Sequence, residues 1–137
     1  MPLLALNQVR AAMAAALAPR TESDPPVLLD LVEAVTPPAL MLEWNDPWIT
    51  SQTVAGGRGG MLATLNVICF AGRVEPGPGV DALEQLVMYV LGRLRDDDTY
   101  TWPLTASQAP RRFDMGGMPL LGVRQSFTIP ISVNGGP

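Results

Sequence analysis

Carboxylates are the side chains with the clearest chemical potential, because the chain holds 13 Asp and Glu residues but no histidine. Paired carboxylates can act as general acid and base or hold a metal ion. The run Asp96-Asp97-Asp98 fits this pattern, and an enzyme that uses carboxylates alone has further candidates in Asp46, Glu75 and Asp114. However, adjacent side chains at a helix end diverge, and no second acidic cluster lies near the run in sequence. A solvated helix terminus therefore explains the three aspartates more simply.

The missing residue types exclude several kinds of site. Without histidine there is no Ser-His-Asp triad, Cys-His pair or histidine-metal site, and without lysine there is no Schiff base. The cluster Gly56-Gly57-Arg58-Gly59-Gly60 lacks the lysine of a phosphate-binding loop. Cys69, the only cysteine, is expected to be buried and inert on the apolar face of a strand. We therefore predict no catalytic residue, no cofactor and no metal.

Composition predicts a single domain, residues 1–137, with a sizeable core. A chain of this length buries roughly two thirds of its unfolded surface and needs no disulfide or metal to fold. Only 16% of the residues are charged, which leaves apolar surface for partners, and the net charge of −4 argues against a surface that grips nucleic acid. No apolar stretch reaches about 18 residues and no charged region precedes the first one, so neither a membrane span nor a signal peptide is expected.

Hydrophobic periodicity predicts two helices. Residues Leu3 to Ala18 are rich in Ala and Leu with apolar residues at helical spacing. A second helix is predicted from Asp81 to Arg95, where acidic residues in the first turn and Arg93 and Arg95 in the last turn suit the helix dipole. The segment Val27 to Val35 is apolar, and its pattern fits either a short helix or an irregular packed segment.

Four strands are predicted by alternation: Pro38 to Trp44, Met61 to Ala71, one within Tyr100 to Phe113, and Leu121 to Val133. Gly116 and Gly117 are expected to form the turn before the last strand. Pro130 cannot donate a hydrogen bond, so that strand is expected at an edge or with a bulge there.

The order helix, strand, strand, helix, strand, strand predicts an α+β fold: a two-layer sandwich whose mainly antiparallel four-stranded sheet carries both helices on one face. Asn45-Asp46-Pro47-Trp48 is typical of a turn, and the glycine cluster follows it. We therefore expect a flexible hairpin arm at about 45–60 that becomes ordered on a partner, with Trp48 as its anchor.

Several short motifs resemble the tail terminator family of long-tailed bacteriophages, in particular the small minor tail proteins of phages of actinobacteria. The motifs are Asn45-Asp46-Pro47-Trp48, the segment Ala71 to Gly79 with the helix that follows, Thr101-Trp102-Pro103, Ala109-Pro110, and the closing hairpin through Pro130-Ile131-Ser132-Val133. The resemblance covers residues 36–133. The order of elements also looks like the terminator fold, a sheet flanked by helices that assembles as a ring.

The resemblance implies a structural virion protein of the tail and neck region, assembled in the host cytoplasm. It would form a homo-oligomer, a hexameric ring, that caps the tail tube, stops polymerisation of the major tail tube protein and joins the tail to the head-completion complex. Genomic DNA would pass through the lumen without specific binding, and no membrane would be involved. One alternative is a head-completion or stopper protein of the neck. Alternatives from other classes are a small carboxylate-dependent enzyme and a regulatory domain with a closed apolar pocket.

The predicted contacts to a neighbouring subunit or the tail tube are Trp48, Arg58, Arg73, Glu75, Arg111, Arg112 and Phe113. Arg73 and Glu75 follow a strand at a Pro/Gly hinge, although a solvated loop pair would look the same. Arg111 and Arg112 are adjacent on a predicted strand and must point to opposite faces. We expect at least one of them to bind carboxylates of a neighbouring subunit, the alternative being an exposed arginine that aids solubility.

Overall fold

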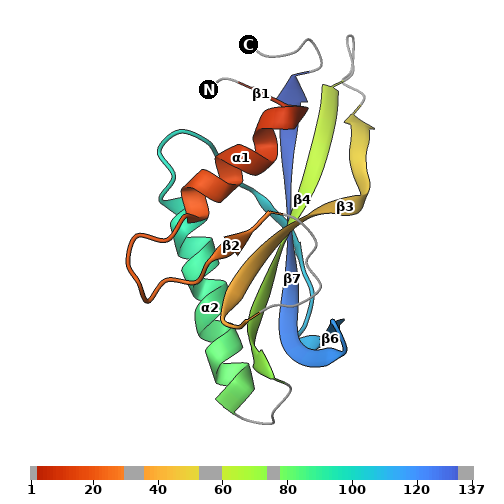
Figure 1. Cartoon of the computed structure of the whole chain (residues 1–137). Coiled ribbons are helices and arrows are strands. Elements are labelled where there is room, and N and C mark those ends of the chain that lie inside the picture. The colour runs from red at the N-terminus through yellow and green to blue at the C-terminus, as the bar shows by residue number, and fades with distance from the viewer. Residues whose placement is uncertain (1–2, 30–35, 53–59, 74–77, 133–137) are drawn as a thin grey trace.

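The computed structural model describes residues 3–29, 36–52, 60–73 and 78–132. In these residues a seven-stranded sheet and two helices form a mixed α+β arrangement (Figure 1). The elements in chain order are β1 (Leu4–Ala5), α1 (Leu6–Leu17), β2 (Val27–Leu28), β3 (Ala39–Gln52), β4 (Gly60–Arg73), α2 (Pro78–Arg95), β5 (Leu104–Ser107), β6 (Arg111–Met115) and β7 (Met118–Ser132). Neither described helix is long and apolar enough to cross a membrane.

The centre of the sheet is antiparallel, with β4 between β3 and β7. Two short strands, β1 and β2, extend the sheet in parallel next to β7 and β3. The predicted sheet had four strands, and the structure has more for two reasons. Strands of two residues are too short to produce an alternating pattern, and the predicted strand within 100–113 is interrupted before Arg111, which separates β5 from β6. Both β5 and β6 pair with β7.

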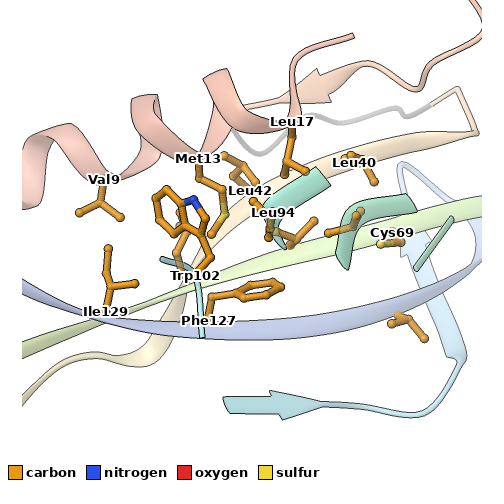
Figure 2. Packing of buried hydrophobic residues seen from close by; sticks show 14 of the residues in the cluster. Val9, Met13, Leu17, Leu40, Leu42, Cys69, Leu94, Trp102, Phe127 and Ile129 are labelled. Atoms are coloured by element: carbon orange, nitrogen blue, oxygen red, sulfur yellow. The ribbon is translucent and has the colours of Figure 1, made fainter. Parts of the chain in front are cut away.

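Both helices pack on the same face of the sheet, which confirms that part of the predicted layer arrangement (Figure 1). The buried side chains of α1 are Val9, Met13 and Leu17, spaced at four residues, and they point toward the sheet (Figure 2). They meet Phe127 and Trp102 in the middle of the core, where both are buried. The main core therefore lies between the helices and β3, β4 and β7.

A second, smaller cluster lies on the face of the sheet that the helices leave free. It consists of Ala39, Met41, Ile68, Phe70 and Leu120, with Leu28, Phe113 and Met115 packed against it. The β6–β7 hairpin covers this cluster, and the rings of Phe70 and Phe113 meet edge to face with 5.5 Å between their centroids. A side chain at Gly122 would lie 2.8 Å from the ring of Phe113, so glycine is what lets this ring lie flat on β7.

The predicted turn at Asn45-Asp46-Pro47-Trp48 is wrong, because β3 continues through it to Gln52. Trp44 pairs with Leu65 and Ile49 with Ala63, so the residues between them form a bulge in β3. The side-chain amide of Asn45 donates to the carbonyl of Pro47 at 3.0 Å and stabilises the bulge. Turn-forming residue types are also those that a bulge uses. Of the expected arm, residues 53–59 lie outside the described residues.

The two glycines predicted between the last strands are confirmed as the hairpin turn, with φ of 60° at Gly116 and 82° at Gly117. The strand that contains Pro130 is not at the edge of the sheet, and its pairing with β4 has no bulge at Pro130. The amide of Thr128 donates toward β5, to the carbonyl of Pro103 at 3.2 Å, and residues two apart in a strand address the same neighbour. Pro130 therefore faces the gap between β5 and β1, whose pairing starts at Ile131, and no donor is needed there.

Candidate assembly interface

Trp48 is presented to solvent by the bulge in β3. Its side chain is 45% exposed and packs edge to face on Trp44, with 5.3 Å between the ring centroids. In a regular strand, residues four apart share a face but lie about 13 Å apart. The bulge between Trp44 and Ile49 bends the strand and brings the two rings into contact. Sequence reasoning singled out Trp48 and treated Trp44 only as the end of a predicted strand.

The two tryptophans line a hollow of about 570 Å³ that is open to solvent at the start of α1. Its remaining lining is Ala5, Leu6, Asn7, Arg10, Ile49, Met61, Ile131 and Ser132. We call this hollow the tryptophan pocket. Arg10 is the only charged residue in this lining. The expectation of a closed apolar pocket for a regulatory ligand is not met by this open site.

The start of α1 adds further positive potential to the tryptophan pocket. Its N-cap is Ala5, whose side chain cannot accept a hydrogen bond, and its first turn has no acidic residue. Only the side chain of Gln8 reaches back, accepting from the amide of Ala5 at 3.0 Å. The N-terminal end of a helix carries a partial positive charge from its free N–H groups. The pocket is therefore apolar with a positive rim.

Arg111 and Arg112 point to opposite faces of β6, as predicted. Arg111 stacks over the ring of Phe113 at 4.6 Å, on the side of the second cluster. Arg112 binds Asp114 at 3.0 Å, and both of these side chains are about two thirds exposed. Phe113 is half-buried on Phe70, which gives it a packing role that the sequence did not indicate. The predicted contacts of these residues to a neighbour remain a prediction.

The structure brings part of the predicted set together. Leu120 of β7 pairs with Arg73 on one side and with Phe113 on the other, so β7 lies between the end of β4 and β6. Trp48 belongs to the other end of the sheet, near β1 and the start of α1 (Figure 1). Arg58 and Glu75 lie outside the described residues.

Asp97 is the exception in the acidic run after α2. Asp96 and Asp98 are exposed, as a solvated helix terminus predicts, but Asp97 accepts hydrogen bonds from its neighbours. Its carboxylate receives the indole N–H of Trp102 at 2.7 Å and the amide of Thr99 at 2.9 Å. Asp97 therefore stabilises the turn after α2 and fixes the position of the buried Trp102.

The other candidate carboxylates are divided among separate elements. Asp46 lies in the bulge of β3, and Asp114 lies on β6 with Arg112 as its partner. Within residues 3–29, 36–52, 60–73 and 78–132, no group of three or more His, Cys, Asp or Glu side chains is arranged to hold a metal ion.

The hydrogen bonds of Asp97 should stabilise the fold in a way that is lost in acid. Desolvation acts to raise the pKa of Asp97, but the hydrogen bonds from Trp102, Thr99 and Tyr100 outweigh it and lower the pKa below its ordinary value of 3.8. Its contribution is thus fully present above pH 3.8 and is lost as the pH falls through the lower, folded pKa. We expect Asp97→Asn to have a lower free energy of unfolding in urea than the native chain at pH 7. The difference between the two free energies should become smaller below pH 3.8. A difference that stays constant down to pH 2.5 would contradict this.

Cys69 is buried in β4, which confirms its predicted position, and burial raises the pKa of its thiol to about 12. Because the thiolate is the reactive form, we expect a maleimide at pH 7.5 to leave the folded chain unlabelled and to label it fully in 6 M guanidinium chloride. Mass spectrometry reads out both states. Rapid labelling without denaturant would show that the strand opens or that the thiol is accessible.

A polar network missed by the sequence analysis lies on the helix-free face. Asn66 is buried at 1% exposure, accepts from the hydroxyl of Ser126 at 2.6 Å, and donates toward Glu43 and Asn45. Arg124 completes the network with a 3.0 Å contact to Glu43. The only signal in the sequence is that Asn66 interrupts an otherwise apolar strand, and this does not reveal its partners on other strands.

Arg93 joins the two helices. Its guanidinium donates to the carbonyls of Ala16 at 2.9 Å and Ala18 at 2.7 Å, at the end of α1, and to the hydroxyl of Tyr89 at 2.6 Å. Sequence reasoning assigned Arg93 to the dipole of its own helix. In the structure it satisfies the free carbonyls at the end of the other helix, which need such a donor.

Comparison with known proteins does not add a functional assignment. No protein-family model matches the chain, and no curated protein has a significantly similar sequence. The functional proposal therefore rests on the residues, the fold and the surfaces described above.

Proposed function

We propose that this chain is the tail terminator of a long-tailed bacteriophage, a structural virion protein of the tail and neck region. Copies of it form a ring, a hexamer by the sequence resemblance, that caps the tail tube, ends its polymerisation and presents a surface to the head-completion complex. The role is structural rather than catalytic. DNA passes through the lumen without specific contacts.

The observation that carries the proposal is the order and layering of the elements. The predicted order helix, strand, strand, helix, strand, strand looks like the terminator fold, a sheet flanked by helices. The elements α1, β3, β4 and α2 follow this order, and three strands, β5, β6 and β7, stand where two were predicted. Both helices lie on one face of the sheet, and the second cluster lies on the other face (Figure 1). Two separate faces suit a subunit that must bind its own copies and the tube.

The surface charge also favours this role. Each phosphate contact would hold DNA back, so a lumen that lets it pass should offer few unpaired cations. The chain has nine Arg and no Lys against 13 acidic residues. Arg112 and Arg124 are already paired with Asp114 and Glu43.

Adding the purified protein to polymerising tail tube protein tests the proposal. We expect tubes that stop at shorter lengths and carry an extra ring at one end in negative-stain electron microscopy. The free ring should have about six times the 14.6 kDa mass of the chain by mass photometry. Tubes that grow unchanged would contradict the proposal, and binding to the head-side connector without binding to the tube would indicate a stopper protein instead.

A further inference from the structure

The outer face of α2 carries a row of exposed side chains, two of which, Glu84 and Met88, line an open hollow together with Ser107, Gln108 and Pro110. Val80, Glu84 and Met88 follow one another at four-residue spacing and are all exposed. Met88 is 66% exposed, the highest value among the large exposed apolar side chains. Asp81 flanks the row, so the surface combines apolar side chains with two carboxylates. We call it the Met88 row.

The Met88 row and the tryptophan pocket are complementary in charge. The row is apolar and acidic, whereas the pocket is apolar and lined by Arg10 without a carboxylate. A methionine side chain packs favourably against aromatic rings, and the pocket holds two of them. Glu84 lies one helical turn from Met88, at a spacing that would place it at the positive rim formed by Arg10 and the start of α1.

We infer that the Met88 row of one copy docks in the tryptophan pocket of a second copy, and that this contact builds the ring. The inference rests on the proposed function and names the contact between neighbouring subunits of the ring. The two patches differ and are formed by different elements, and α2 starts at the end of the sheet away from the pocket (Figure 1). A contact between unlike patches is heterologous, and such contacts close into rings when the rotation allows.

Cross-linking tests the contact without touching its anchors. Asn7 lines the pocket and Gln85 lies beside the Met88 row, and both are exposed. The double variant Asn7→Cys/Gln85→Cys, treated with a short bismaleimide, should give a ladder of covalent multimers that ends at the ring. Each single variant should stay uncross-linked, because a heterologous contact never brings two identical positions together. The buried Cys69 does not interfere.

Matched controls decide the outcome. Asn7→Cys/Leu104→Cys, which replaces the row by an exposed position on β5, should give no ladder. Met88→Asp should weaken assembly at least about tenfold while the circular dichroism of the subunit stays unchanged, because it places a charge in an apolar contact. A ring that forms without the ladder, or dimers from Asn7→Cys alone, would overturn the inference.

The result also separates this inference from the proposed function. Rings that cap tail tubes but do not cross-link through the designed pair leave the proposed function standing and overturn the contact. Cross-linking of Gln85→Cys to the tube protein instead of to a second copy also overturns it. A full ladder from a protein that leaves tube growth unchanged supports the contact and contradicts the terminator role.

Discussion

Replacing Arg93 by alanine should lower the free energy of unfolding by about 2–4 kcal/mol, because it removes charged hydrogen bonds and leaves the carbonyls at the end of α1 without this donor. The guanidinium binds the carbonyls of Ala16 and Ala18 at the end of α1, far from Arg93 in sequence. The loss should therefore appear as loosening of α1 as well as reduced global stability. Urea unfolding gives the first quantity, and hydrogen exchange of the amides of α1 gives the second.

Arg95 provides the matched control for this variant. It lies two residues further along α2, so its side chain points to a different side of the helix. That side chain is 82% exposed beside Asp96. Arg95→Ala should change the free energy of unfolding by less than about 0.5 kcal/mol. Equal losses from the two variants would show that the charge of α2, rather than the contact with α1, is what matters.

Replacing Phe70 by alanine should cost about 3–5 kcal/mol, the usual range for a fully buried phenylalanine. Phe70 is 0% exposed and lies in the second cluster, away from the helices. The hairpin that covers this cluster should open first. Hydrogen exchange in the variant should therefore increase more, relative to the native chain, at the amides of β6 than at those of α1. Guanidinium unfolding and hydrogen exchange measure the two effects.

Phe113→Ala separates the hairpin from the cluster beneath it. Phe113 is half-buried and contacts Phe70 through its ring edge, so its removal should cost only about 1–2 kcal/mol. Exchange in β6 should still rise strongly. If Phe70→Ala proved no more costly than Phe113→Ala, the second cluster would contribute little to the stability of the chain.

The parts of the fold that sequence could predict are those with long, regular patterns. The periodicity of α2, the alternation of β4 and β7, and the glycine pair at 116 and 117 each depend on neighbours in sequence, and each is confirmed. β1 and β2 could not be predicted, because two residues exist as a strand only through the partner they pair with. The bulge at Asn45 to Trp48 uses turn-forming residues and so looks like a turn.

The candidate interface shows the same limit. Trp48 was a candidate because exposed tryptophans are common at interfaces, but the tryptophan pocket draws its lining from the start of α1, β3, β4 and the end of β7. Contacts between segments so far apart leave no local pattern. Arg93 is a similar case, since its role depends on carbonyls of another helix, and a carbonyl carries no side-chain signature.

The position of β7 in the sheet has a consequence for synthesis. β7 pairs with β4 on one side and with β1, β5 and β6 on the other, yet it follows all of them in the chain. During translation, the long inner edge of β4 has no strand to pair with until residues 118–132 have left the ribosome. Nascent chains on the same messenger would meanwhile expose identical open edges to one another. A pause in translation before residue 118 would therefore promote aggregation, whereas one after residue 132 would not.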